Sequence, residues 1–370
     1  MLDRRAALAL LGASLGTALD APGGPRSWPP PVGAQPLPSA GAPSPPGAQP
    51  LAPLQRGMAL GLFHEDPLWS YAGLLREIKE LGTTHVSLTL AYYQEHAGST
   101  TLYAHPRFSA PDETLRRTVR AAHALGLSVM IFPIVRLESP RSFSEWRGTL
   151  KPQDPAAWWQ SYERLLLHLA ELSAREKVAL LCIGSELSTL DGAPERPRWQ
   201  ALVGAIRKVY RGLLTYSGNW DHYPQVGLYD LCDLPGLCAY FPLAGRADPT
   251  PVPLAKLTEV WQKRRADLEA FAAQLGKPLL LTEVGYLSQR GAAAFPWEEG
   301  AQGPVDLEEQ RRCYQAFAAT WAGSPALRGV YFWNYYGWGG RVSRGYTPRH
   351  KPAADEIERY FLSEAQRPAR

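Results

Sequence analysis

Short apolar runs alternate with amphipathic stretches along the chain from about residue 56 to the C-terminus. The apolar runs are rich in Leu, Val, Ile and aromatic residues and are bounded by glycine or polar residues, which is typical of buried β-strands. They predict eight strands, at residues 57–63, 84–90, 127–135, 178–184, 212–218, 234–243, 277–284 and 328–337. The amphipathic stretches predict helices between most of these strands and after the last one, at 66–82, 111–126, 155–175, 198–211, 254–276, 306–322 and 352–363.

Capping residues support several of the predicted helices. Asp66 can accept a hydrogen bond from the first turn of the helix at 66–82, and Pro67 suits the first helical position. Gly82, Gly126 and Gly276 each follow a helical stretch, where glycine readily adopts the left-handed conformation that ends a helix. Apolar runs begin soon after these glycines, so that helix, glycine and strand follow one another repeatedly.

This repetition is the pattern of βα units in a buried parallel sheet. Eight strands in one region fit a (β/α)8 TIM barrel of the α/β class better than an open, doubly wound sheet. No glycine-rich phosphate loop follows the first strand, which argues against a nucleotide-binding fold. We therefore predict a single barrel domain at residues 56–370.

Two of the predicted strands end in a glutamate. Glu186 lies in LLCIGSEL, residues 180–187, at the end of the fourth strand, and Glu283 lies in LLLTEVGY, residues 279–286, at the end of the seventh. Because burial of a lone carboxylate is costly, each glutamate either reaches solvent, pairs with an arginine as a structural ion, or belongs to a site. In a (β/α)8 barrel, catalytic groups lie at the C-terminal ends of the strands.

The fourth and seventh strands face each other across the mouth of such a barrel, so the two carboxyl groups can lie about 5–5.5 Å apart, as in retaining glycosidases. In that mechanism one carboxylate attacks the anomeric carbon, while the other carboxyl protonates the leaving oxygen and later deprotonates water. Apolar surroundings and a charged neighbour hold the acid protonated near neutral pH. The two strand ends therefore favour glycoside hydrolysis over structural ion pairs.

Composition narrows the classes of function. The chain has 370 residues, 45% hydrophobic and 20% charged, with a formal net charge of +4. Its Lys and Arg residues are scattered among nearly as many acids, so nucleic acid is not an expected partner. The 12 Trp and 17 Tyr residues serve mainly core packing, but their flat faces also suit stacking on sugar rings. The paired Trp158 and Trp159 are expected to pack on the barrel.

The four cysteines, Cys182, Cys232, Cys238 and Cys313, lack the spacing of metal ligands. Cys182 and Cys238 fall in apolar runs and are expected to be small core residues. The even count leaves a pairing of Cys232 with Cys238 open. No metal ion or organic cofactor is expected.

The first 55 residues differ from the rest. Residues 1–21 carry adjacent arginines, Arg4 and Arg5, before an apolar run too short to span a bilayer. We expect an export signal that resembles the twin-arginine type, with a Sec signal as the alternative, and hence a periplasmic or extracellular protein. Residues 22–55 are dense in Pro, Ala and Gly, which predicts a disordered linker.

The two glutamate segments resemble the acid/base and nucleophile segments of clan A glycoside hydrolases. The domain as a whole is similar to glycoside hydrolase family 113, whose characterised members are β-mannanases. The segments that carry this resemblance, in chain order, are EWRGTLKP, WWQSYERLL, CIGSEL, YSGNWDHY, AYFPL, LLTEVGY, FWNYYGW and GYTPRHKPA. The resemblance implies a (β/α)8 barrel with Glu186 as the general acid/base and Glu283 as the nucleophile.

The resemblance also implies roles for residues at the ends of other strands. Tyr240 would lie between the glutamates and hold the nucleophile through its hydroxyl group, and Trp333 would form a platform beneath the sugar. Asn219 and Trp220 would contact the substrate. Most clan members carry Asn before the acid/base, whereas Ser185 stands there in this chain, as in family 113.

Several residues at the predicted rim of the barrel complete the candidate site. His64 follows the first strand, Tyr92 and Gln94 follow the second, and Arg136 and Glu138 follow the third. We predict that His64, Tyr92 and Arg136 contact the substrate; solvated loop or supporting roles are the alternative for each. The glycine-rich GWGG at 337–340 is expected to shape the cleft.

We expect a retaining β-glycoside hydrolase, most similar to β-1,4-mannanases, that acts as a monomer on a polysaccharide or oligosaccharide and has no membrane span in its mature form. The choice of mannose rests on the family resemblance alone. Two alternatives stay open: a transglycosylase or hydrolase that remodels another β-linked polysaccharide, and a non-catalytic carbohydrate-binding barrel.

Overall fold

The computed structural model describes residues 53–246, 248, 250–299 and 303–367. The export signal predicted at 1–21 and nearly all of the linker predicted at 22–55 lie outside the described residues. The first strand of the structure begins at Gln55.

Eight parallel strands form a closed barrel in which each strand pairs with its sequence neighbours and the last closes against the first. The strands are β1 (Gln55–Gly61), β2 (His85–Gln94), β3 (Ser128–Leu137), β4 (Leu180–Ser185), β5 (Leu213–Asn219), β6 (Leu234–Cys238), β7 (Leu279–Val284) and β8 (Leu327–Phe332). Every predicted strand is present, and the predicted (β/α)8 barrel is confirmed.

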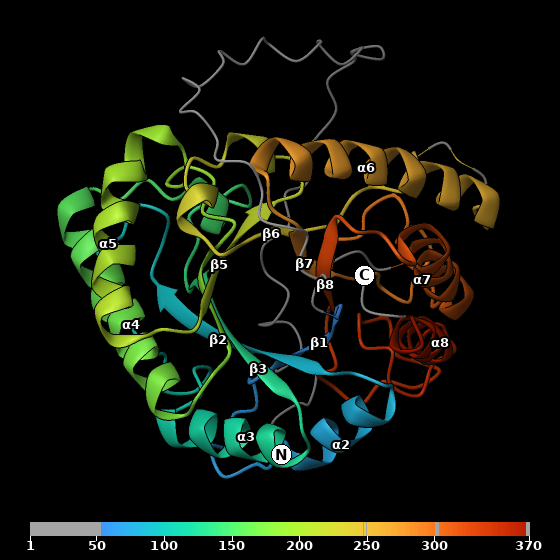
Figure 1. Cartoon of the computed structure of the whole chain (residues 1–370), viewed down its shortest axis with the longest axis horizontal. Helices are drawn as coiled ribbons and strands as arrows, with labels where there is room; N and C mark the ends of the chain where they lie inside the picture. The colour runs from blue at the N-terminus through green and yellow to red at the C-terminus, as the bar shows by residue number, and fades with distance from the viewer. Residues whose placement is uncertain (1–52, 247, 249, 300–302, 368–370) are drawn as a thin grey trace, which may run out of the picture.

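Helices surround the barrel as a ring (Figure 1). They are α2 (Ala72–Glu80), α3 (Asp112–Ala124), α4 (Pro155–Arg175), α5 (Arg196–Val209), α6 (Leu254–Leu275), α7 (Leu307–Trp321) and α8 (Ala353–Ala365). Short 3-10 helices lie in the connections: η1 (Arg147–Thr149), η2 (Ala193–Glu195), η3 (Tyr223–Gln225) and η4 (Tyr229–Leu231). The last two replace a full helix between β5 and β6, where the sequence also predicts none.

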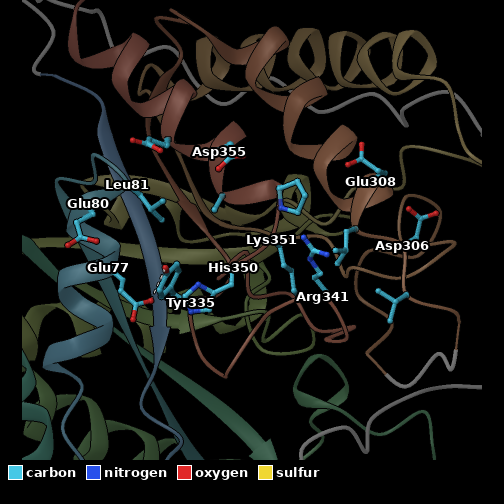
Figure 2. Close-up of a pocket in the computed structure, with 15 residues that line it drawn as sticks. Glu77, Glu80, Leu81, Asp306, Glu308, Tyr335, Arg341, His350, Lys351 and Asp355 are labelled. Atoms are coloured by element: carbon cyan, nitrogen blue, oxygen red, sulfur yellow. Dashed lines mark hydrogen bonds between the residues drawn. The ribbon is translucent and has the colours of Figure 1, made fainter.

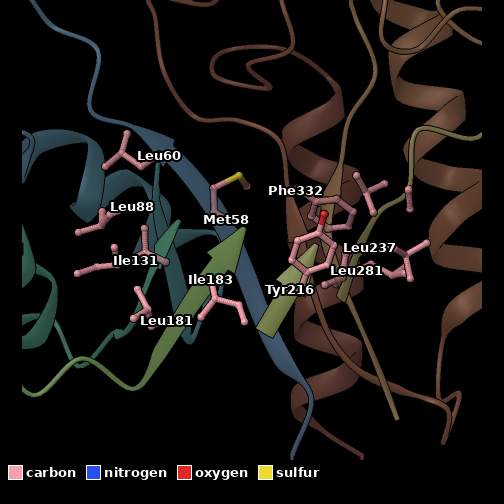
Figure 3. Close-up of a cluster of buried hydrophobic side chains, with 14 of the residues drawn as sticks. Met58, Leu60, Leu88, Ile131, Leu181, Ile183, Tyr216, Leu237, Leu281 and Phe332 are labelled. Carbon is pink, nitrogen blue, oxygen red and sulfur yellow. The ribbon is translucent and has the colours of Figure 1, made fainter. Parts of the chain in front are cut away.

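Alternate side chains of a strand face opposite sides of the barrel wall. On β2, Leu88 and Leu90 belong to the large apolar cluster that includes helix residues, whereas Ala91 and Tyr93 belong to a cluster whose buried members all lie on strands. The second cluster therefore fills the barrel interior. Figure 3 shows strand members of the first cluster, among them Met58, Ile131, Ile183, Leu237 and Leu281.

One predicted helix starts later than its sequence indicates. Asp66 and Pro67 were expected to begin the helix at 66–82, but α2 begins at Ala72. Asp66 instead accepts a hydrogen bond from the backbone N–H of Leu68 at 2.8 Å, which closes a turn. Asp-Pro suits a turn as well as a helix start, so the local signal does not separate the two. Gly82 ends the helical region at φ +79°, as expected.

All four cysteines are buried and free. The possible pairing of Cys232 with Cys238 is therefore not formed. Trp158 and Trp159 both pack on the barrel from α4, which confirms the predicted packing role. Among the described residues, none of the helices combines the length and apolar character needed to cross a membrane.

Candidate active site

Irregularities in two strands turn the predicted glutamates toward one site. The pairing register shifts between Cys182 and Ser185 on β4 and between Leu281 and Val284 on β7. Strict alternation would place Glu283 on the helix side of the wall together with Leu281. The register shift lets the side chain point toward the mouth of the barrel instead, where Tyr240 contacts it.

Glu283 is buried and only half satisfied. The Tyr240 hydroxyl donates a hydrogen bond to Oε2 at 2.8 Å, whereas Oε1 is buried and has no hydrogen-bond partner in the described part of the chain. Burial, and then the negative charge of Glu186, raise the pKa of Glu283 to about 7, although the charge of Arg147 and the Tyr240 hydrogen bond oppose the rise. A buried carboxylate oxygen without a partner is an atom left available for a ligand.

Glu186 directly follows β4 and is 4% exposed. Its backbone has φ +54°, in the left-handed region that non-glycine residues seldom adopt. Its N–H donates to the carbonyl of Ser217 at 2.8 Å. Backbone strain of this kind persists only where surrounding contacts hold it, and it concentrates at functional sites.

Arg147 was not predicted as a site residue, yet it lies at the centre of the charge arrangement. It belongs to η1 in the connection after β3, and its guanidinium donates to Glu186 Oε2 in an ion pair. Burial alone would lower the pKa of Arg147, but the charges of Glu186 and Glu283 outweigh it and raise the pKa above its usual value. Its Nε is buried without a hydrogen-bond partner among the described residues, so this cation also has a free donor in the site.

A layer of small polar side chains lies inside the barrel next to the carboxyl groups. The Cys238 sulfur is 3.0 Å from Ser217 Oγ and 3.7 Å from Ser185 Oγ. Ser217 also forms a short hydrogen bond with the Thr282 hydroxyl. The prediction of Cys238 as a small buried residue is correct, but its neighbours are hydroxyl groups as well as apolar side chains.

Aromatic side chains gather around Glu283. Tyr240, Trp333 and Tyr346 share one cluster with the partly buried Phe63 and Trp220. Trp333 follows β8 directly and is 8% exposed. The turn after β7 is close enough to it that a Cβ on Gly285 would lie 2.8 Å from the Trp333 carbonyl oxygen, so glycine is required there. The cluster brings together three of the predicted site residues, Tyr240, Trp333 and Trp220.

Trp220 has a partner that the sequence did not reveal. Its ring stacks on Trp297 at a centroid distance of 5.1 Å, and Trp297, from the connection after β7, is 40% exposed. Asn219 ends β5 and is largely buried, and its Oδ1 accepts the N–H of Trp220 at 2.9 Å. Asn219 thus shapes the turn that presents Trp220.

The three predicted substrate contacts at the rim, His64, Arg136 and Tyr92, lie in different places in the structure. His64 stacks on Trp69 at 4.7 Å, and its Nδ1 accepts the N–H of Asp66 at 3.1 Å, so it organises the connection after β1. Arg136 pairs in register with Tyr93 near the end of β3, on the side of the wall that faces the interior. The placement of Tyr92 corrects the prediction for it: this side chain packs in the helix-facing cluster, and its neighbour Tyr93 faces the interior.

The two other rim residues, Gln94 and Glu138, bond to other side chains and to the backbone of the protein. Gln94 is fully buried, accepts a hydrogen bond from Trp158 Nε1 at 2.9 Å and donates to the carbonyl of His96 at 2.8 Å. Glu138 accepts from Tyr103 and lies 3.3 Å from His105 Nε2. Both residues therefore support the loops around the barrel mouth.

A separate cavity of about 1110 Å³ lies against α2, the start of α7 and the start of α8 (Figure 2). Its lining includes Glu77, Tyr335, Arg341 and Lys351 and contains neither of the paired glutamates. The Lys351 amine is buried, donates to Ser288 Oγ at 2.7 Å and to the Gly345 carbonyl at 2.8 Å, and so ties the connections after β7 and β8 together. This cavity is distinct from the candidate active site.

A (β/α)8 barrel with two buried glutamates and several aromatic side chains at its mouth is an arrangement that suits a carbohydrate-active enzyme. The model of Glycoside Hydrolase Family 113 matches residues 70–344. This chain belongs to Glycoside Hydrolase Family 113 and is a glycoside hydrolase. The resemblance seen in the sequence is confirmed.

Solved structures of the same family are similar over nearly their whole length. The family 113 β-mannanase AaManA from Alicyclobacillus acidocaldarius, in complex with ManMIm, has 27% sequence identity and a TM-score of 0.75, over 85% of this chain and 98% of that one. A family 113 β-1,4-mannanase complex has 22% identity and a TM-score of 0.74, over 84% and 100% of the two chains.

A β-glucuronidase from Ruminococcus gnavus shares the fold at 14% identity and a TM-score of 0.56, over 84% of this chain and 50% of that one. A comparison with curated protein sequences found no match.

Proposed function

We propose that this glycoside hydrolase cleaves β-1,4-linked mannose polymers with retention of anomeric configuration, using Glu283 as the nucleophile and Glu186 as the acid/base. The observation that supports this most directly is the buried carboxyl of Glu283, whose pKa is raised by burial and by the negative charge of Glu186 and whose Oε1 has no hydrogen-bond partner among the described residues. The choice of mannose is supported by similarity to the β-mannanases described above.

In the first step, the free Oε1 of Glu283 attacks the anomeric carbon while Tyr240 holds Oε2. Glu186 gives its proton to the glycosidic oxygen, and a covalent glycosyl ester forms as that bond breaks. In the second step, Glu186 takes a proton from water, and the water oxygen displaces Glu283 from the anomeric carbon. The sugar leaves with its original configuration.

The charge state of Glu283 follows from its surroundings. Burial and the negative charge of Glu186 raise its pKa, whereas the charge of Arg147 lowers it. The Tyr240 hydrogen bond favours negative charge on Glu283. In the proposed mechanism the leaving oxygen receives its proton from Glu186, which Arg147 contacts in the structure.

The experiment measures hydrolysis of β-mannan, cellulose and their oligosaccharides by the purified protein, beside Glu283→Gln and Glu186→Gln. Early products are analysed for anomeric configuration and for chain length. Loss of mannan cleavage in both variants, with β-configured first products, supports the proposal. Products with inverted anomeric configuration would overturn the retaining mechanism. Cleavage of cellulose but not of mannan would overturn the proposed mannose specificity. Products longer than the substrate would indicate transglycosylation.

We further propose that the enzyme is exported from the cell, because Arg4 and Arg5 precede a short apolar run in the sequence. Expression of the full chain with a C-terminal tag, followed by fractionation, tests this. Replacement of Arg4 and Arg5 by Lys distinguishes the twin-arginine route, which it blocks, from a Sec route, which it leaves open.

A further inference from the structure

The turn that carries Glu186 is held by a buried network outside the site described above. Glu186 has a left-handed backbone, and the next residue, Leu187, donates its N–H to the hydroxyl oxygen of Tyr216 at 3.0 Å. Tyr216 lies on β5 and is fully buried. Two hydrogen bonds from adjacent N–H groups, to Ser217 and to Tyr216, therefore fix this turn against β5.

The Tyr216 hydroxyl is itself oriented by an acid. Because the hydroxyl accepts from Leu187, its single hydrogen is free to donate, and it lies 2.7 Å from Asp191 Oδ2. The other carboxylate oxygen of Asp191 lies 2.9 Å from His222 Nε2. Asp191 is fully buried, so Tyr216 and His222 together satisfy both of its oxygens.

Asp191 also joins the connection after β4, which begins with Glu186, to the connection after β5, which carries Trp220. Asp191 follows the Glu186 turn, whereas the N–H of His222 donates to the Asn219 carbonyl at 3.0 Å in the turn that presents Trp220. The Asp191 carbonyl accepts from the N–H of Gly227 at 2.8 Å. Movement of one connection relative to the other would break these bonds.

We propose that Tyr216 and Asp191, with His222, are positioning residues that hold the Glu186 carboxyl in line with the leaving glycosidic oxygen. The inference rests on the proposed function, because it concerns the proton that Glu186 gives. Removal of the Tyr216 hydroxyl leaves the Leu187 N–H and one Asp191 oxygen without a partner, which frees the strained turn to relax. The hydrogen bond from Tyr240 that holds Glu283 is not removed by this substitution.

The test exploits the chemistry of the leaving group. Aryl β-glycosides with acidic phenols need little proton donation, whereas phenyl glycosides and oligosaccharides depend on it. In Tyr216→Phe, kcat/KM for the oligosaccharide and the phenyl glycoside should fall roughly 10- to 100-fold. For the 2,4-dinitrophenyl glycoside it should change less than about twofold by the same reasoning. If Tyr216 had only a structural role, its loss would lower kcat/KM by the same factor for all three substrates.

Tyr210→Phe is the matched control, since it removes a buried hydroxyl that bonds to the Val178 carbonyl at 3.0 Å, before the start of β4. Asp191→Asn should show the same leaving-group dependence as Tyr216→Phe, and the double variant should add little to either. All rates are measured well below the melting temperature of each variant, so that only folded protein is compared.

The comparison uses whichever aryl β-glycoside the wild-type enzyme cleaves, mannoside or glucoside. The outcome therefore does not depend on whether the proposed mannose specificity is correct. Equal losses on all leaving groups in Tyr216→Phe overturn this inference alone. A folded wild-type protein that cleaves no aryl β-glycoside and no β-linked oligosaccharide overturns the proposed function and this inference together.

Discussion

Tyr240 donates its hydroxyl hydrogen to Oε2 of Glu283 at 2.8 Å, while Oε1 of the same carboxyl has no hydrogen-bond partner among the described residues. The two oxygens are therefore inequivalent. The held oxygen fixes the plane of the carboxyl group, and the other is left for the anomeric carbon. The hydrogen bond also lowers the pKa of Glu283 against the burial and the Glu186 charge that raise it.

Tyr240→Phe should move the acidic limb of the pH profile of kcat/KM to higher pH. The substitution removes a donor to the charged form of Glu283, so the pKa of Glu283 in the free enzyme rises. A hydrogen bond to a charged group contributes about 1.5–3 kcal/mol, which corresponds to a shift of roughly one to two pH units. Steady-state rates between pH 4 and 9 measure the shift.

The control is Tyr331→Phe, which removes a buried hydroxyl that bonds to Gln55 at 2.8 Å, near the other end of the barrel. Its pH profile should match that of the wild type. An unchanged acidic limb in Tyr240→Phe would show that Tyr240 has no influence on the charge of Glu283.

Glu283→Gln should be more stable than the wild type at neutral pH, and the difference should disappear in acid. The carboxyl titrates near 4.5 when unfolded and near 7 when folded, so its contribution to stability is complete below pH 4.5 and is lost as the pH rises to 7. The size of this loss is on the order of 3 kcal/mol.

Urea unfolding of the wild type and Glu283→Gln at pH 4, 5.5, 7 and 8 gives this difference directly. The free energy of unfolding of the wild type should fall relative to the variant between pH 4.5 and 7 and stay level above 7. A variant that is less stable than the wild type at every pH would indicate that Glu283 is a structural ion.

Arg147→Met should raise the pKa of Glu283, because the charge of Arg147 lowers it, and should leave Glu186 without its ion pair. We expect kcat/KM to fall roughly 100-fold, within the range of 10²–10³ for loss of a charge-stabilising group. The acidic limb should move to higher pH. Arg147→Lys retains the charge and should keep the limb near its wild-type position. Identical pH profiles for the Met and Lys variants would contradict this role.

The sequence predicts those features of the fold and the site that depend on the local pattern of apolar and polar residues. Strand ends follow from apolar runs, and Glu186 and Glu283 each close such a run, so their placement at the mouth of the barrel follows once eight strands are recognised. Tyr240 and Trp333 required the family resemblance, because an aromatic residue after a strand is most often part of the core.

The sequence does not predict what depends on register or on loop conformation. Tyr92 was predicted to contact the substrate, but its neighbour Tyr93 is the tyrosine that faces the barrel interior. Successive residues of a strand face opposite sides, so an error of one position exchanges the two faces. Arg147 and Trp297 lie in long connections, and only the folded chain brings them to Glu186 and Trp220. The register shift near Glu283 arises from strand pairing, which the sequence of one strand does not reveal.

Lys351 should make stability depend on pH in the direction opposite to Glu283. Burial lowers the pKa of Lys351 from 10.5 to about 7. Its contribution to stability is therefore present above pH 10.5 and is lost as the pH falls to 7, because only the unfolded chain is fully charged in between.

Lys351→Met replaces the amine by an apolar side chain of similar length and removes the titration. Between pH 7 and 9.5, the wild type should gain stability relative to Lys351→Met, whereas Lys256→Met, at a half-exposed lysine that pairs with Asp248, should show no such gain. Urea unfolding at pH 7, 8.25 and 9.5 measures the two differences. A constant difference for Lys351→Met across this range would mean that the buried amine stays charged, and that the connections after β7 and β8 accommodate the cation through Ser288 and Gly345.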